Sequence, residues 1–420
     1  MASSNIAKLF VEIGFKDKEL SKGLRNAERG LTRLNTSINR MNTALGGAAS
    51  KAFYAFTGSV TAFMTASAMV GARFDREMTF VGAISNATEQ DLQSLTDKAR
   101  DLGATTMYTA TQSATAMQNF ARAGMDVNEI LDATGPALKL AGAAGEDMSL
   151  STQPLAATMA QFSSQGYEAG TVADVFATAL TGSLFDLRSL TEAMKYGGTV
   201  GANFGMTLEE TTAALAQFRN LGLEGSLAGT NFRMAMAHAA KATDKARKVL
   251  AKYGLTAKDI NPELHSFGEI METVGEASMS TTDLLEVFGR RAGANIAGIA
   301  TQFADGSTTF YELLGDIEGS AGAVESLYQR ATSNVLDEFK ILKSAFQELL
   351  LTTFDQYRDP ALSLLKDITG GVNSLTAGVK EDSNAIRASI DELFAYLRSI
   401  FIFAEGDASS LIANLIKGFT

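Results

Sequence analysis

Apolar residues recur in the first part of the chain with alternating spacings of four and three residues. The positions are Leu20, Leu24, Ala27, Leu31, Leu34, Ile38, Met41 and Leu45. This spacing places them along one side of an α-helix and is the a/d repeat of a coiled coil. An amphipathic helix that lies on its own domain carries a similar stripe, so both interpretations stay open. Gly23 and Gly30 each weaken such a helix by about 1 kcal/mol, which indicates that it needs partners to persist.

Two shorter patterns flank this heptad segment. Residues 6–15 alternate between apolar and polar or small side chains, which predicts a short N-terminal strand. Residues 52–72 carry no charge, and about 20 apolar residues are enough to span a bilayer as a helix. Several Thr and Ser residues make this run only moderately apolar, so a helix buried in a bundle or oligomer is favoured, with membrane insertion as the alternative.

From residue 74 to residue 300 the pattern predicts short helices separated by glycine. Pairs of an oxygen-bearing residue and a residue three positions later fit or approximate a helix capping box. The pairs are Thr109 with Gln112, Asp126 with Glu129, Thr207 with Glu210, Thr256 with Asp259, and Ser266 with Glu269. Glycines that precede three of these pairs fit helix C-caps, namely Gly124, Gly205 and Gly254. The pattern therefore predicts a compact array of helical hairpins.

Beyond residue 320 the apolar periodicity predicts long amphipathic helices. One apolar face carries Val324, Tyr328, Ala331, Val335, Leu342, Phe346 and Leu349. We expect this helix to end before Pro360, because proline lacks the backbone donor, and Gly370-Gly371 to act as a hinge. A further helix and an apolar tail follow, and the tail is expected to be buried against another copy or a partner.

These patterns together predict an all-α protein in which long heptad or amphipathic helices flank a compact core of helical hairpins. We expect a strand and coiled-coil helix in residues 1–50 and an uncharged apolar helix in 51–73. The helical core is expected in 74–300, with long amphipathic helices and the apolar tail in 301–420.

Composition argues against most kinds of chemistry. The chain has a net charge of −11, so it is a poor candidate for non-specific nucleic-acid binding, which needs a basic surface. It has no cysteine, and its two histidines do not form a His-Glu-x-x-His zinc motif. No serine nucleophile elbow and no phosphate-binding loop are present. We therefore predict no catalytic residues, no metal-binding residues, no cofactor and no enzymatic activity.

The order of short motifs resembles the core region of phage tail tape measure proteins. The segments that carry the likeness are Phe74-Asp75-Arg76-Glu77-Met78, Leu102-Gly103-Ala104-Thr105-Thr106, Ala121-Arg122-Ala123-Gly124, Leu138-Lys139-Leu140-Ala141, Ala173-Asp174-Val175, Leu190-Thr191-Glu192-Ala193-Met194-Lys195-Tyr196, Gly222-Leu223, Gly225-Ser226-Leu227-Ala228-Gly229-Thr230 and Phe288-Gly289-Arg290-Arg291-Ala292. They cover roughly half of the chain, and their order is far more specific than any one of them. Such proteins usually continue with long coiled-coil and apolar segments, whereas this chain stops soon after the core.

The resemblance implies a structural protein of a phage or phage-tail-like particle. It implies a homo-oligomeric bundle that occupies the tail tube, nucleates tube assembly on the tip or baseplate, sets tail length and is ejected before DNA or cargo passes. The implied partners are other copies, the tail tube protein, the tip or baseplate hub proteins, tail assembly chaperones and the host membrane on ejection, with no specific nucleic acid. The implied locations are the virion tail lumen and tip, and the host cytoplasm during assembly. The alternative is a membrane-active protein whose apolar helices form a conduit in the host envelope.

Overall fold

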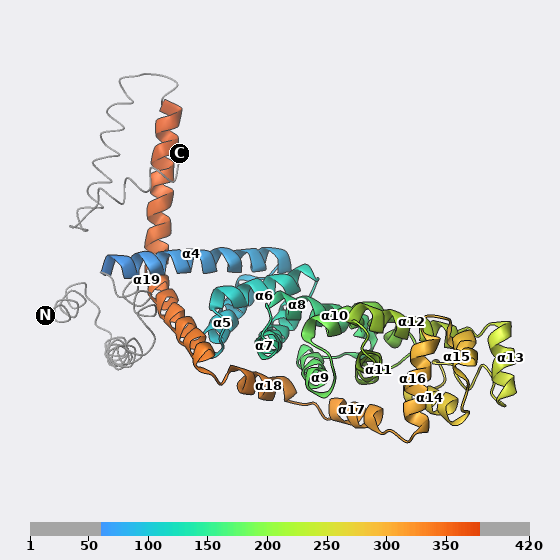
Figure 1. Cartoon of the computed structure of the whole chain (residues 1–420). Helices are drawn as coiled ribbons and strands as arrows, with labels where there is room; N and C mark the ends of the chain where they lie inside the picture. The colour runs from blue at the N-terminus through green and yellow to red at the C-terminus, as the bar shows by residue number, and fades with distance from the viewer. Residues whose placement is uncertain (1–59, 379–420) are drawn as a thin grey trace. The chain divides into compact units, whose positions relative to one another are not determined.

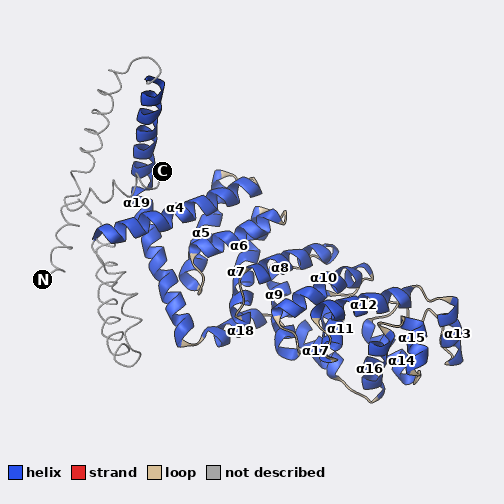
Figure 2. Ribbon diagram, turned by 45° about the horizontal axis from the view of Figure 1, so that its top comes forward, coloured by secondary structure: helices blue, strands red, loops and turns tan. Residues whose placement is uncertain are grey.

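The computed structural model describes residues 60–378, and every regular element within them is a helix (Figures 1 and 2). The chain divides into two compact units, residues 1–70 and 71–420. The α-helices are α4 (Val60–Ser85), α5 (Glu89–Thr105), α6 (Ala110–Arg122), α7 (Val127–Ala144), α8 (Ser149–Gln161), α9 (Ala169–Gly182), α10 (Leu187–Asn203), α11 (Leu208–Asn220), α12 (Gly225–Ala240), α13 (Asp244–Lys252), α14 (Phe267–Glu276), α15 (Thr281–Phe288), α16 (Gly293–Ala304), α17 (Thr309–Glu318), α18 (Ala323–Thr332) and α19 (Val335–Gly378). The all-α prediction is confirmed.

Several helices begin and end where the local sequence predicts. Three of the expected capping boxes are complete: Thr109, Asp126 and Ser266 each accept a hydrogen bond from the third residue of their helix, whose side chain accepts one in return. After α6 and α10, Gly124 and Gly205 adopt positive φ values of 87° and 79°. This left-handed conformation lets the next amide donate back to the last helical turn, which glycine allows without steric cost.

The helices of the hairpin core approach closely where small residues meet. Gly225 and Gly229 on α12 face the backbone of α10 at Ser189 and Ala193. A Cβ atom at either glycine would lie closer than 3.0 Å to a carbonyl oxygen of α10. The two helices therefore pack backbone against backbone, which larger side chains would prevent.

Phenylalanine rings fill the space between the later helices. Phe218, Phe232 and Phe267 come from α11, α12 and α14, and their ring centroids lie 6.1–6.3 Å apart. Phe310 of α17 adds a ring 5.5 Å from that of Phe267. All four rings are buried. Edge and tilted ring contacts at these distances stabilise a core beyond the area that they bury.

Residues beyond 300 return along the earlier helices and complete this array. Helix α17 packs on α9 and α11, and α18 packs on α7 and α9. Figure 1 shows the chain running back past these helices before α19 begins. Helices that are adjacent in space are thus brought together from segments about 90 to 200 residues apart.

Several predictions from the sequence are wrong in detail. No helix begins at Thr256, because the Asp259 carboxylate closes a local turn by accepting from the amide and hydroxyl of Thr256. Pro360 and Gly370-Gly371 neither end nor hinge the last described helix, since α19 runs through them to Gly378. A proline removes one backbone donor, and a helix of 44 residues keeps the bonds on both sides.

Other predictions fall outside the described residues. These are the strand at residues 6–15, the heptad segment at residues 20–45, the first part of the uncharged run, and the helix and apolar tail at the C-terminal end of the sequence. Among residues 60–378, no helix combines the length and the apolar character needed to cross a bilayer.

Candidate assembly site at the base of the long helix

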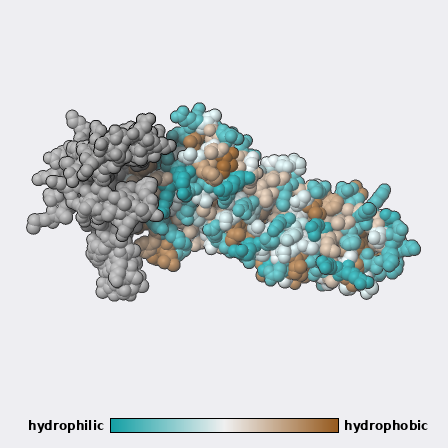
Figure 3. Space-filling view, turned by 90° about the horizontal axis from the view of Figure 1, so that it is seen from above, coloured by the Kyte–Doolittle hydropathy of each residue, from teal (hydrophilic) through white to brown (hydrophobic). Residues whose placement is uncertain are grey.

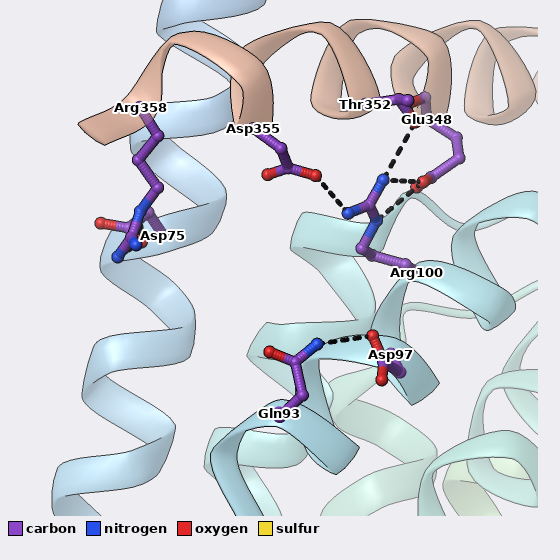
Figure 4. Close-up of polar contacts among 8 residues, drawn as sticks. All are labelled: Asp75, Gln93, Asp97, Arg100, Glu348, Thr352, Asp355 and Arg358. Carbon is purple, nitrogen blue, oxygen red and sulfur yellow. Dashed lines mark hydrogen bonds and ion pairs between the residues drawn. The ribbon is translucent and has the colours of Figure 1, made fainter. Parts of the chain in front are cut away.

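Helix α5 presents an arginine at the edge of its buried face. The helix starts at a capping box in which Thr88 and Asp91 exchange hydrogen bonds. Leu95, Ala99 and Leu102 are buried against the core. Arg100 directly follows Ala99, so its side chain leaves the core along the boundary between buried and exposed surface, where α19 passes (Figure 4).

Three side chains of α19 converge on the guanidinium group of Arg100. Glu348, Thr352 and Asp355 are spaced by four and three residues and therefore share one face of the helix. Arg100 Nε donates to Glu348 Oε1 at 2.7 Å, Nη1 to Asp355 Oδ2 at 2.5 Å, and Nη2 to Thr352 Oγ1 at 3.0 Å. Guanidinium suits this role because its planar fork offers several donors in fixed directions.

These contacts are shielded from water to different degrees. The side chains of Arg100 and Glu348 are 23% and 21% exposed, and that of Asp355 is 50% exposed. Burial opposes the charge on Arg100, but the hydrogen bonds and negative charges of Glu348 and Asp355 raise its pKa overall. Oε2 of Glu348 is buried and has no hydrogen-bond partner in the described part of the chain, so this carboxylate depends on Arg100.

A second set of contacts fixes α19 against α4. Arg358 donates from Nε to Oδ1 of Asp75 at 2.9 Å, and its Nη2 lies 2.6 Å from the same oxygen. The ring of Phe354 packs directly on the backbone of α4 at Gly71, where any Cβ atom would overlap the ring. We call these contacts the α19 junction, which consists of Gly71, Asp75, Arg100, Glu348, Thr352, Phe354, Asp355 and Arg358.

Helix α18 is held on the core just before α19 begins. Asp174 of α9 accepts hydrogen bonds from the amides of Gly322 and Val324 at 2.9 and 2.8 Å and so caps the start of α18. The hydroxyl of Tyr328 accepts from the amide of Met107 at 2.9 Å. The Tyr328 ring lies so close to Gly142 of α7 that a Cβ atom there would approach it within 3.0 Å. The chain thus enters α19 from a fixed direction.

The described residues hold no arrangement typical of a reactive centre. No group of three or more His, Asp or Glu side chains within residues 60–378 is placed to hold a metal ion. A cavity of about 290 Å³ between α9 and the α17–α18 connection is lined by Asp316, Leu327, Arg330 and smaller residues. Both charged groups there are exposed to solvent.

The sequence did not reveal the α19 junction. Arg100 and its partners on α19 are about 250 residues apart, and no short motif links them. The available signal was indirect: an arginine beside a buried alanine, and oxygen-bearing residues spaced by four and three on a predicted helix. Without the packing of α19 on α5, that signal does not distinguish a junction from a solvated helix face.

Residues 96–284 match the family model of phage-related minor tail proteins. The chain is 29% identical over 363 residues to the tape measure protein of Pneumococcus phage Dp-1, covering 85% of this chain and 31% of that protein. It is 24% identical over 312 residues to the probable tape measure protein of Escherichia phage P2, covering 72% of this chain and 38% of that protein. The chain is similar to phage tail tape measure proteins. The resemblance inferred from the motif order is thereby confirmed.

The similarity to tape measure proteins extends beyond the family match and covers most of the described helices. The chain spans about a third of the length of these two curated relatives. No solved structure matches it. Arg100 lies inside the matched segment, whereas its partners on α19 follow that segment.

Proposed function

We propose that the chain is a structural component of a phage or phage-tail-like particle and acts as a tape measure protein. Several copies lie together in the tail tube, nucleate tube assembly on the tip or baseplate, and leave before DNA or cargo passes. The partners under this proposal are other copies, the tube protein, the tip or baseplate hub proteins and the tail assembly chaperones. The protein acts through its length and its contacts rather than through catalysis.

The observation that carries this proposal, beside the similarity to tape measure proteins, is the α19 junction. A length-setting protein needs one end fixed in place and one extended element whose length is proportional to its number of residues. Each helical residue advances the chain by about 1.5 Å, so the 44 residues of α19 extend over about 66 Å. The junction holds residues 348–358 of this helix on a packed core, which gives the part of the helix beyond them a fixed origin.

Acidity supports the same location. The net charge of −11 disfavours retention of the chain on DNA, because phosphate binding draws on positive charge. A protein that must leave the tube ahead of DNA benefits from this lack of affinity.

The location in the tube is tested by protease protection of intact particles. Exposed loops of the core, such as the one around Gly166, should be cut in the isolated chain. The same peptides should stay intact in whole particles and become accessible after ejection is triggered. An outer-surface protein of the same particle is the control and must be cut throughout. Equal cleavage of the core loops in isolated chain and intact particles would reject the lumen location.

A further inference from the structure

The first turns of α19 expose a row of large apolar side chains. Val335, Leu336, Phe339 and Leu342 are 66%, 76%, 37% and 42% exposed. Elsewhere the surface drawn in Figure 3 is mostly hydrophilic or neutral, with hydrophobic side chains gathered in a few places. Apolar residues grouped on one helix in this way indicate a surface that another molecule covers.

The row has the spacing of a coiled-coil seam. Val335, Phe339 and Leu342 are separated by four and three residues, and the half-buried Phe346 and Leu349 continue the same alternation. An α-helix turns about 100° per residue, so these positions form one narrow stripe. A stripe of this period fits a partner helix with the same repeat. The apolar side chains of that helix insert between the side chains of the stripe, as in the knobs-into-holes packing of coiled coils.

The stripe and the α19 junction occupy opposite sides of α19. Ser344 and Leu351 are buried against the core, and Glu348 binds Arg100. Ser344 and Leu351 follow Leu342 and Leu349 by two residues, which places them about 180° from the stripe. A second helix therefore docks on Val335, Phe339 and Leu342 without disturbing the contacts that hold α19 on the core.

Charges beside the stripe favour a second copy in parallel orientation. Glu338 and Lys343 occupy the two positions that flank the seam, and neither forms an ion pair within the described part of the chain. In a parallel, in-register pair, Glu338 of one copy faces Lys343 of the other. An antiparallel pair instead places Glu338 against Glu338 and Lys343 against Lys343, which repel.

We propose that α19 pairs with α19 of a second copy, in parallel and in register, through Val335, Phe339 and Leu342. This inference rests on the proposed function, which requires several copies side by side and pointing the same way in one tube. The pairing begins directly beyond the end of α18, so the copies leave their cores at the same level. That alignment gives every copy the same origin for its extended helix.

Disulfide trapping tests the register, because the chain has no cysteine of its own. The full chain carrying Leu342→Cys should form a disulfide-linked dimer under mild oxidation, since equivalent seam positions meet within disulfide reach. The matched control is Lys340→Cys, which is exposed on the same helix but faces away from the stripe. We expect cross-linking at position 342 to be at least about tenfold faster than at position 340. Equal rates at the two positions would overturn the proposal.

Charge reversal tests the orientation. Glu338→Lys or Lys343→Glu alone should weaken the dimer by about threefold to tenfold in sedimentation measurements. The double reversal should restore the affinity to within about twofold, because the two charges exchange places. A double variant that is no better than the single variants would overturn the parallel register, and so would a monomeric chain at every concentration.

This inference and the proposed function fail separately. A chain that stays monomeric while tail length still follows the length of α19 removes only the pairing. A chain that pairs as described while tail length ignores α19 counts only against the proposed function.

Discussion

Replacing Arg100 with alanine should release α19 from the core. The substitution removes three hydrogen bonds and leaves the buried Oε2 of Glu348 beside no positive charge. Hydrogen bonds to charged groups contribute about 1.5–3 kcal/mol each when shielded. Asp355 is half exposed and adds no more than about 1 kcal/mol. Because Arg100 and Glu348 keep about a fifth of their exposure, we expect the α19 junction to lose about 2–3 kcal/mol.

Hydrogen exchange separates this local effect from a general loss of stability. A loss of 2–3 kcal/mol should speed exchange of the α19 amides next to the core by about 30- to 150-fold. Amides of α7 and α12 should keep their protection, because every side-chain hydrogen bond of Arg100 in the described part of the chain goes to α19. Arg76→Ala is the matched control, since Arg76 is 79% exposed and, among residues 60–378, forms an ion pair only with its neighbour Glu77. Unchanged exchange in α19, or equal acceleration in α7 and α12, would refute this reasoning.

Three further predictions concern the core. Gly229→Ala should lower the free energy of unfolding in urea by about 1–3 kcal/mol, because the new methyl group meets the backbone of α10. The control Gly170→Ala should be neutral or stabilising, because a methyl group there meets no atom within 4 Å. An unchanged free energy of unfolding for Gly229→Ala would contradict the close packing. Tyr328→Phe should cost about 1–2 kcal/mol by the same measurement, because the amide of Met107 loses its acceptor, and no loss would show that this bond contributes nothing. Burial, followed by the charges of Glu269 and Glu318, raises the pKa of Glu210 above 4.5, although the hydrogen bond from Phe267 opposes this shift. The contribution of Glu210 to stability is therefore full below pH 4.5 and is lost as pH rises through the raised pKa. Glu210→Gln should therefore gain stability relative to the parent chain as pH increases from about 4.5, and a difference that does not change with pH would contradict this prediction.

Local signals in the sequence predicted most helix ends. Capping boxes and glycine C-caps act within four to six residues, so the chain needs no tertiary contact to specify them. Thr207 shows the limit of this reasoning. It caps α11 as expected, but the carboxylate of Glu210 accepts from the amide of Phe267 at 2.6 Å instead of closing the capping box. That choice depends on the packing of α14 against α11, which no local pattern contains.

Proline was the least reliable signal in this chain. Pro136 and Pro154 lie inside α7 and α8, and Pro360 lies inside α19. Each removes one backbone donor, but α7 and α8 are stabilised by burial along the rest of their length. Pro154 is itself buried in the core. Tertiary packing thus outweighs a local preference that, read alone, would have divided these helices.

The α19 junction could not be predicted for a related reason. Its ion pairs join residues about 250 to 280 positions apart, and the pairing depends on how the core turns α19 back onto α4 and α5. The sequence shows that the residues are charged and where they lie along each helix. It does not show which charges meet.

The most direct test of the account is the length of tails built with a longer α19. A copy of residues 335–362 inserted after residue 362 adds four heptads, keeps the α19 junction intact and extends the helix by about 42 Å. The same 28 residues inserted in the loop at Gly166 are the control. Electron micrographs of particles that carry the α19 insertion should show tails longer by about 42 Å, and the loop insertion should leave tail length unchanged. Tails of normal length and normal yield with the α19 insertion would contradict the claim that this helix helps to set the length of the tube.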